Sequence, residues 1–297
     1  MLRKLFLIAL LFVSRCSFAQ IEDSIVTPNA VLHFYKYGKG TPIILLSGGP
    51  GISSHQEDDL AVKLSEKYQA ILFDQRGTGK SHTFPIDSTN INLEVYLQDL
   101  ELLRKKLGLS ELNLCGHSWG AILASAYTAK YPDKVNSVIL IGGGELDNNL
   151  GEVVQSCIDA RFQLSDTTAW YYWNNPQNAA KDSVKAANEI RKINWSLLIY
   201  DRSKLEAVMT QATHGIFNKK ISELMWKEMH RMKINRFSPI ARSFKGKALL
   251  LYGWQDPIGL TTLSSYQKVF PSAYTIGINN CGHMPSVEQP EIFYTAI

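Results

Sequence analysis

Residues 112–130 read LNLCGHSWGAILASAYTAK. An apolar run comes first, the pentapeptide GHSWG at 116–120 follows, and helix-forming residues come after it. A strand that turns this sharply into a helix strains the backbone at the bend, and the positions two residues away on either side must be small. Gly116 and Gly120 meet that requirement. The stretch therefore predicts a serine hydroxyl, that of Ser118, held at the end of a strand beside backbone N–H groups.

Apolar runs on both sides of this stretch alternate with helical patterns. We expect strands at residues 31–35, 43–46, 69–73, 112–116, 135–141, 247–252 and 273–278, and helices at 91–107, 119–131 and 261–270. Continuous apolar strands suit burial on both faces, with 31–35 at the edge. The alternation predicts an α/β fold with a mostly parallel, doubly wound sheet, whose active site lies at the carboxyl ends of the strands.

The alternation breaks at Glu145. Residues 147–235 carry helical patterns and many aromatic residues but no good buried strand. We expect a helical lid inserted between two core segments, 20–146 and 236–297. The aromatic run WYYW at 170–173 either lines a substrate cavity or packs inside the lid, and both interpretations stay open.

The first nineteen residues differ from the rest. Two basic residues precede an unbroken apolar run at 5–13, and small residues follow at 17 and 19. This order is typical of a secretory signal peptide, and the run is too short to cross a bilayer. We expect residues 1–19 to be removed and the mature protein to be secreted or periplasmic, without stable membrane insertion. The alternatives are a buried N-terminal element and a lipoprotein signal with Cys16 as the lipidated residue.

Composition narrows the partners. Of the 297 residues, 45% are hydrophobic and 20% charged, and the net charge is only +4, with no basic stripe or nucleic-acid motif. A small molecule or short peptide is therefore the expected partner, and nucleic acid is not. Cys115, Cys157 and Cys281 show no metal-type spacing, and we interpret them as free thiols rather than as part of a disulfide.

An activated serine needs a general base and an acid that orients the base. Asp256 and His283 each follow an expected late strand, so both belong to the edge of the sheet where Ser118 lies. The order Ser, Asp, His is that of an α/β-hydrolase. Ser118 would attack a carbonyl carbon, His283 would accept its proton, and Asp256 would hold the imidazole. Glu145, after the 135–141 strand, is the alternative acid.

The oxyanion formed by that attack needs two donors. The backbone N–H of Trp119 is the first, and Gly48 or Gly49, with Gly49 preferred, supplies the second from the loop after the 43–46 strand. Asp74 and Arg76 are interpreted as structural, pairing with each other beneath the site. No role is assigned to His117.

Together these motifs resemble the α/β-hydrolase superfamily and, within it, the proline iminopeptidase-like serine peptidases. The resemblance covers nearly all of the mature chain except the lid. Its carriers are SGGPG at 47–51, DQRGTGKS at 74–81, GHSWG at 116–120, the Asp256 loop and GHMP at 282–285. It implies Ser118, Asp256 and His283 as the triad, the Gly48–Gly49 loop and Trp119 as the oxyanion hole, and no metal or cofactor.

The chain departs from the family at two places. The family usually has a histidine where this chain has Ser47, and its members read the free amine of the substrate with lid glutamates. The candidates for that role here are Glu152, Glu189, Glu206, Glu223 and Glu228. The resemblance implies an aminopeptidase; an esterase or lactonase for small apolar esters and a non-catalytic binding protein are the rival hypotheses.

Overall fold

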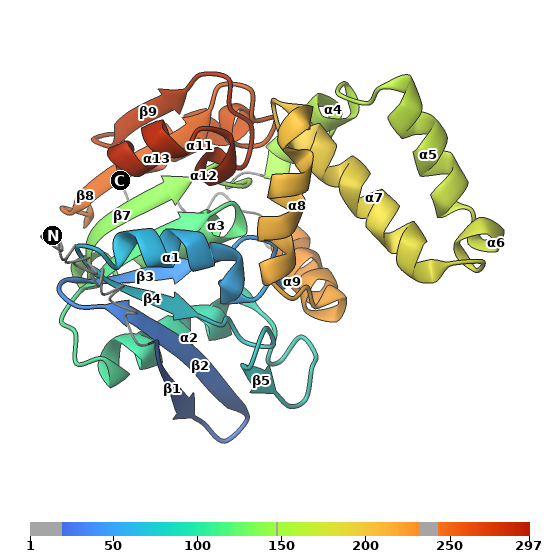
Figure 1. Ribbon diagram of the computed structural model, residues 1–297. Helices are drawn as coiled ribbons and strands as arrows, with labels where there is room; N and C mark the ends of the chain where they lie inside the picture. The colour runs from blue at the N-terminus through green and yellow to red at the C-terminus, as the bar shows by residue number, and fades with distance from the viewer. Residues whose placement is uncertain (1–19, 147, 232–242) are drawn as a thin grey trace, which may run out of the picture.

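A nine-stranded sheet forms the centre of the computed structural model, which describes residues 20–146, 148–231 and 243–297 (Figure 1). The strand order is β1-β2-β4-β3-β6-β7-β8-β9, and β5 pairs with β2. The strands are β1 (Ile21–Val26), β2 (Ala30–Gly38), β3 (Pro42–Leu46), β4 (Gln69–Phe73), β5 (His82–Thr83), β6 (Leu112–His117), β7 (Val135–Ile141), β8 (Lys247–Gly253) and β9 (Tyr274–Ile278).

The strands from β4 to β9 in this order are parallel to one another, whereas β2 runs antiparallel to β1, β4 and β5. The chain leaves β3 toward β4 on one side and later returns to place β6 on the other side. Such a reversal opens a crevice at the carboxyl ends of the strands, where doubly wound sheets bind ligands. The predicted α/β fold is thus confirmed, and its switch point lies between β3 and β6.

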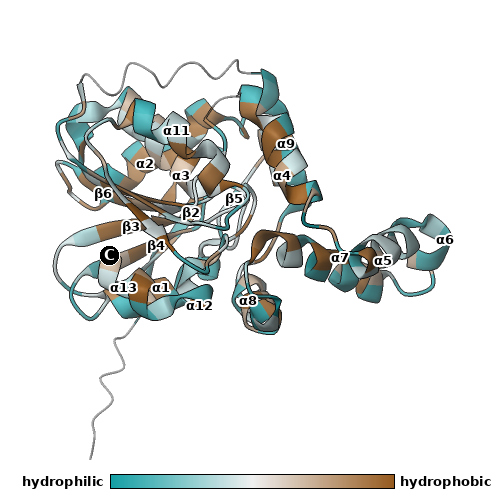
Figure 2. Ribbon diagram, turned by 90° about the horizontal axis from the view of Figure 1, so that it is seen from above, coloured by the Kyte–Doolittle hydropathy of each residue, from teal (hydrophilic) through white to brown (hydrophobic). Residues whose placement is uncertain are grey.

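Helices cover both faces of the sheet. In Figure 2, α2 (Leu93–Lys106), α3 (Trp119–Lys130) and α11 (Gly259–Val269) lie on one face, and α1 (Asp58–Leu64), α12 (Pro285–Glu288) and α13 (Pro290–Ala296) lie on the other. Alternate residues of one strand therefore enter two different cores: Ile44 and Leu46 belong to one cluster, and Ile43 and Leu45 to the other. This two-sided burial explains why the strands read as continuous apolar runs.

The inserted segment divides into an arm and a part that packs on the core. Helices α5 (Leu164–Asn174), α6 (Pro176–Ala179) and α7 (Ser183–Leu198) project from the body (Figures 1 and 2), and we call residues 164–198 the lid arm. The inserted helices outside the arm are α4 (Gly151–Asp159), α8 (Leu205–His214) and α9 (Lys219–Arg231). Ile221, Met225 and Met229 of α9 are buried in the main apolar cluster, so α9 belongs to the core by its packing.

One expectation from the sequence needs correction, and two elements were not predicted. The expected edge strand at 31–35 is internal, because β1 pairs along its outer side. No sequence pattern predicted β1, because its run IEDSIV mixes apolar with charged residues and stays partly exposed. The helix α1 was also not expected. Residues 1–19 and the boundary at 236, by contrast, lie outside the described residues.

One of the simpler expectations is borne out by the described residues. Cys115, Cys157 and Cys281 are free thiols there, as predicted. Across residues 20–146, 148–231 and 243–297, no helix is both long and apolar enough to span a membrane.

Candidate active site

Ser118 stands at the bend between β6 and α3. Its backbone has φ 54° and ψ −113°, a strained conformation for a residue with a side chain. A Cβ on Gly116 would lie 2.2 Å from the carbonyl oxygen of Gly120, and one on Gly120 would lie 2.1 Å from that of Leu46. Both positions therefore require glycine. Ser118 is half-buried between buried neighbours, so its hydroxyl is the group that this turn presents at the sheet edge.

His283 and Asp256 form a buried pair. His283 Nδ1 lies 2.9 Å from Asp256 Oδ2, and the side chains are only 3% and 0% exposed. The other carboxylate oxygen accepts the N–H of Ile258 at 2.9 Å, which fixes the plane of the acid. Glu145 makes no such contact with His283; its charged neighbour is His230. Of the two acids considered, Asp256 is thus the one that contacts His283.

The elbow and the pair lie on the two sides of residues 141–142. Ser118 N–H donates to the carbonyl of Ile141 at 2.9 Å. A Cβ on the next residue, Gly142, would lie 3.2 Å from His283 Nδ1 and 2.9 Å from Asp256 Oδ2. The hydrogen bonds of the described residues include none between Ser118 Oγ and His283. The structure thus places the backbone of Ser118 and the His283–Asp256 pair against adjacent residues at the end of β7, and the proton-transfer contact itself belongs to the proposal below.

Glu288 holds the loop that carries His283. This carboxylate, 1% exposed, accepts the N–H groups of Gly282 at 2.9 Å, Met284 at 3.2 Å and Tyr200 at 2.7 Å. His283 N–H itself donates to the carbonyl of Leu198 at 2.9 Å. Burial raises the pKa of Glu288, and the backbone donors partly oppose that rise. The loop of His283 and the chain just after α7 are therefore fastened to the same buried acid.

The loop after β3 lies beside the elbow, because a Cβ on Gly48 would be 3.5 Å from Ser118 Cβ. Gly48 N–H donates to Gln56 Oε1 at 2.9 Å, so it is not free to donate to an oxyanion. Within the described residues, the N–H groups of Gly49 and Trp119 have no hydrogen-bond acceptor. The expectation of Gly48 as a possible donor is therefore corrected, and of the predicted donors only the N–H groups of Gly49 and Trp119 are free in the described part of the chain.

Known proteins share this architecture. A family model described as the alpha/beta hydrolase fold matches residues 41–290. The chain belongs to the α/β-hydrolase family. It is 28% identical over 280 residues to a proline iminopeptidase of Heyndrickxia coagulans, a match that covers 89% of this chain and 91% of the relative.

Solved structures agree with the fold of this hydrolase. A proline iminopeptidase-related protein of Thermus thermophilus superposes with a TM-score of 0.70 at 20% identity, covering 94% of this chain and 95% of that one. A thermophilic esterase of Thermogutta terrifontis superposes with a TM-score of 0.65 at 20% identity, covering 94% and 96%. Both likenesses concern the fold alone.

Side chains around the loop after β3, residues 47–53, fix it to the hydrolase core. Trp119 Nε1 donates to Gln75 Oε1 at 2.8 Å, and Gln75 Nε2 donates to the carbonyl of Ser47 at 3.1 Å. Ser47 Oγ closes the loop by donating to the carbonyl of Ile52 at 2.8 Å. The serine that replaces the family histidine therefore has a structural task of its own.

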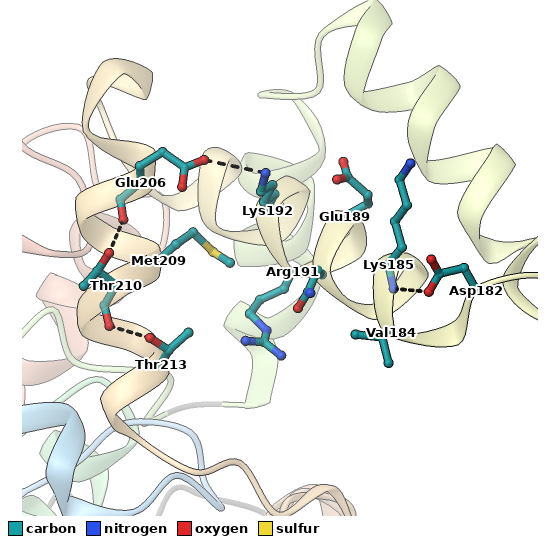
Figure 3. A pocket seen from close by; sticks show the side chains of 11 residues that line it. Asp182, Val184, Lys185, Glu189, Arg191, Lys192, Glu206, Met209, Thr210 and Thr213 are labelled. Atoms are coloured by element: carbon teal, nitrogen blue, oxygen red, sulfur yellow. Dashed lines mark hydrogen bonds and ion pairs between the residues drawn. The ribbon is translucent and has the colours of Figure 1, made fainter.

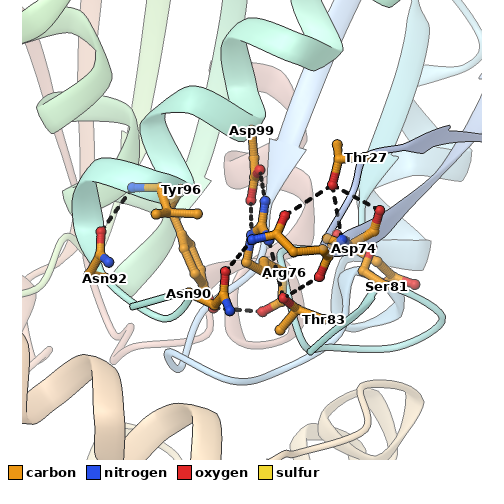
Figure 4. A network of polar contacts seen from close by, with 12 residues as sticks. Thr27, Asp74, Arg76, Ser81, Thr83, Asn90, Asn92, Tyr96 and Asp99 are labelled. Atoms are coloured by element: carbon orange, nitrogen blue, oxygen red, sulfur yellow. Dashed lines mark hydrogen bonds and ion pairs between the residues drawn. The ribbon is translucent and has the colours of Figure 1, made fainter. Parts of the chain in front are cut away.

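Asp74 and Arg76 do not pair with each other (Figure 4). Arg76 forms two hydrogen bonds to the buried Asp99, at 2.8 Å from Nε and 2.6 Å from Nη2. Asp74 instead accepts from the N–H and hydroxyl of Ser54, at 2.9 and 2.7 Å. The expectation of a structural role is kept, but the pairing was wrong, because α2 brings Asp99 closer to the guanidinium than its neighbour in sequence.

The aromatic run packs within the lid arm. Trp170 meets Phe162 edge to face, Tyr172 meets Trp173 in the same way, and Tyr171 is 74% exposed. A groove of about 400 Å³ beside Trp170 is lined by residues of α4, α5 and α7 and of the turn between α4 and α5, and by none from the loops of Ser118, Asp256 or His283. Of the two interpretations, packing within the lid is therefore the one that the contacts support.

The lid glutamates mostly form ion pairs away from Ser118. Glu206 pairs with Lys192 at 3.6 Å across a groove of about 500 Å³ between α7 and α8, which Glu189 also lines (Figure 3). Glu223 and Glu228 pair with neighbours on their own helix, and Glu152 is exposed.

Glu145 lies one residue beyond a backbone contact of Ser118. It follows Gly144, whose N–H donates to the carbonyl of Ser118 at 3.2 Å. The side chain is half-buried, and burial raises the pKa of its carboxyl against the opposing charge of His230. Sequence reasoning considered Glu145 only as an alternative acid.

Several residues of this site were missed by sequence reasoning. Glu288, Gln56 and Glu57 lie in helical turns and carry no motif of their own. His117 lies inside the pentapeptide but had no visible partner. The role of each residue becomes apparent only when the fold brings its partner loop close to it.

No group of three or more His, Cys, Asp or Glu side chains within the described part of the chain is arranged to hold a metal ion.

Proposed function

We propose that this hydrolase is a serine aminopeptidase of proline iminopeptidase type, which cleaves an amide bond through an acyl-enzyme. The observation that carries the proposal is the buried His283–Asp256 pair beside the strained elbow of Ser118. A short peptide with a free N-terminus is the proposed substrate, and no metal or cofactor takes part.

The proposed chemistry has two halves. Ser118 Oγ attacks the substrate carbonyl carbon while His283 Nε2 takes its proton, and the carbonyl oxygen becomes an oxyanion held by the N–H groups of Gly49 and Trp119. The C–N bond then breaks as His283 returns the proton to the leaving amine. Water attacks the ester in the same way, again with His283 as base, and releases the acid. Asp256 stabilises the imidazolium in both halves.

The amide specificity is supported by two observations. The relative that matches nearly the whole chain is a proline iminopeptidase. In addition, the half-buried Glu145 lies next in sequence to the residue that bonds Ser118, without a hydrogen-bonded partner among the described residues. A carboxylate there is suited to bind the free α-amine of a substrate, because a charged hydrogen bond away from bulk water discriminates strongly against a neutral N-terminus.

One observation favours an esterase or lactonase as the second candidate. The loop after β3 pairs with residues that follow α8: Ile52 bridges to Phe217, and Ser53 N–H donates to the carbonyl of Ile216 at 3.0 Å. Ile216 and Phe217 are 67% and 57% exposed, so an apolar edge borders this loop. Such an edge suits an apolar acyl group.

A substrate panel tests the two candidates. We expect hydrolysis of prolyl and other amino-acyl arylamides and none of the same arylamides after N-acetylation. Activity confined to short acyl esters would favour the second candidate. Replacing Glu145 by Gln should raise KM for free-amine substrates about tenfold or more, the loss expected for a charged hydrogen bond, and leave ester hydrolysis unchanged.

Labelling with a fluorophosphonate tests the nucleophile separately. The purified protein should be labelled at Ser118, and Ser118→Ala should lose both the label and about 10⁶-fold in turnover. An unlabelled, folded wild-type protein would instead indicate a hydrolase-fold binding protein.

We also propose that residues 1–19 export the chain to the periplasm or the medium. The support is the basic, apolar and small-residue order of that segment. Cell fractionation and N-terminal sequencing should find a mature chain that begins at Gln20. A mature chain that begins at a lipidated Cys16 would identify the lipoprotein variant.

A further inference from the structure

We propose that His117 is a positioning residue for His283, and that Glu57 holds His117 in this task, so that a second acid–imidazole pair lies behind the first. The inference rests on the proposed function, because the position of His283 matters to turnover only if His283 is the general base. It concerns the one residue of the GHSWG pentapeptide that the mechanism above leaves unused.

The first contact joins His117 to the main chain of His283. His117 Nε2 lies 2.9 Å from the carbonyl oxygen of His283, and the two ring centroids are 4.9 Å apart. A carbonyl oxygen can only accept, so His117 Nε2 must carry a proton. Leu198 and Glu288 accept the N–H groups of residues 282–284, and His117 donates to the carbonyl of His283. These hydrogen bonds together restrain the backbone of the base.

The second contact joins His117 to a buried acid. His117 Nδ1 lies 3.6 Å from Glu57 Oε1, and the two side chains are only 6% and 8% exposed. That carboxylate oxygen has no hydrogen-bond partner among the described residues. An unpaired buried carboxylate is costly, so the pair is stabilised when Nδ1 also carries a proton and His117 is an imidazolium.

The charges around the ring favour that protonated form. Burial by itself lowers the pKa of His117, but Glu57, the carbonyl of His283 and Asp256 raise it and outweigh burial, so the pKa lies above its usual value. The other titratable groups near Glu57 are Cys115 and Tyr294. Burial raises the pKa of both, that of Tyr294 to about 12, and both are therefore neutral in the working range.

The His117 ring lies where three loops meet. His117 directly precedes Ser118 within the elbow, its Nε2 reaches the His283 loop, and a Cβ on Gly48 would lie 3.5 Å from its Nδ1. The cavity beside the pair measures only about 10 Å³ and is lined by Gln211, Ser286 and their neighbours, so the ring has little room to move. A change at His117 should therefore reach His283 rather than be absorbed locally.

Kinetics with matched variants test the inference. His117→Leu removes both ring nitrogens, Glu57→Gln keeps the ring but removes its acid, and His117→Gln keeps an N–H donor of similar reach. We expect kcat of His117→Leu to fall roughly 10- to 100-fold with KM within about twofold, as for a small misplacement of a catalytic group. The other two variants should show smaller losses of kcat, with His117→Gln partly restoring the function of the bond to His283.

His55→Gln is the matched control. His55 and Asp58 form another histidine–acid pair on the same segment, 3.0 Å apart, but this pair is about 30% exposed and has no contact with His283. Its kinetic constants should equal those of the wild type. Wild-type kcat in His117→Leu, or equal losses in the control, would overturn the inference. If His117→Leu does not fold, Glu57→Gln and His117→Gln carry the test.

An activity-free measurement separates this inference from the proposed function. In the Ser118→Ala background, the ring protons of His117 should titrate by NMR above the range of an exposed histidine, and Glu57→Gln should move that titration downward. A titration at or below the normal range would contradict the pair even if Ser118 proves to be the nucleophile. Conversely, an active Ser118→Ala would contradict the proposed function and leave the titration result standing.

Discussion

The loop of His283 and the lid arm are held in opposite ways. Three consecutive residues of the loop, Gly282 to Met284, have their N–H groups bonded to Glu288 or Leu198, and the imidazole and carbonyl of His283 are bonded as well. The lid arm exposes large apolar side chains to solvent, among them Leu164 at 84%, Tyr171 at 74% and Val184 at 71%. Both regions adjoin the same point, because the arm ends at Leu198.

We interpret this difference as a division of tasks, in which the loop holds the position of the base and the arm governs access to the site. A base must hold its geometry within a fraction of an ångström, which needs buried, fully bonded backbone. A lid needs alternative positions of similar free energy, and regions with few buried contacts provide them. We therefore expect substitutions in the loop to change kcat and substitutions on the arm to change KM or nothing.

The largest effect on turnover should come from Asp256, the acid that pairs with His283. Asp256→Asn keeps the volume but removes the charge that orients His283, and turnover should fall about 10⁴-fold. The measurement is kcat on an acyl ester, with Glu145→Gln as the control that keeps its rate. A large loss in the control and none in Asp256→Asn would transfer the role of the acid to Glu145.

A smaller effect should follow from Glu288, which fastens the loop to the chain just after the arm. Glu288→Gln places an amide N–H₂ among backbone N–H donors, so it should lower the free energy of unfolding by about 1–3 kcal/mol. The loop should also loosen, and kcat should fall roughly 10- to 100-fold with little change in KM. Urea unfolding and steady-state kinetics measure the two effects. Lost stability with unchanged kcat would show that Glu288 does not position His283.

The next effect depends on pH. The pKa of His117 is raised in the folded protein, so its pair with Glu57 contributes stability in full below the unfolded value of about 6.5. That contribution is lost as the pH rises through the higher folded pKa. Glu57→Gln should therefore be less stable than the wild type by about 1–3 kcal/mol at pH 5.5, with the gap narrowing by pH 9. Unfolding curves at several pH values check this, and a constant gap would exclude the ion pair.

The smallest effect should come from the arm. Tyr171→Ser replaces a side chain that is 74% exposed, and the free energy of unfolding should change by no more than about 0.5 kcal/mol. The value of kcat should stay unchanged. A raised KM would show that the arm contacts the substrate, whereas a lowered kcat would contradict the separation between arm and loop.

The order of the core elements was predictable because each carries a local signal. Buried parallel strands read as apolar runs, and the elbow needs glycines that any chain of this geometry must supply. The edge strand β1 lacked such a signal, since half of its residues are polar and none of the six is buried. The division of the inserted segment could not be predicted either, because helical periodicity shows an apolar face but not what that face meets.

By itself, the sequence determined the α/β fold, the elbow at Ser118 and the strand ends that carry Asp256 and His283, since spacing and residue type specify backbone geometry locally. Only the tertiary structure decided which partners the side chains take. Arg76 pairs with Asp99, the Gly48 N–H donates to Gln56, and His117 donates to the carbonyl of His283. The physical reason is that a buried polar group bonds to whatever the packing brings within about 3 Å, and that neighbour is set by the whole fold rather than by the adjacent residues.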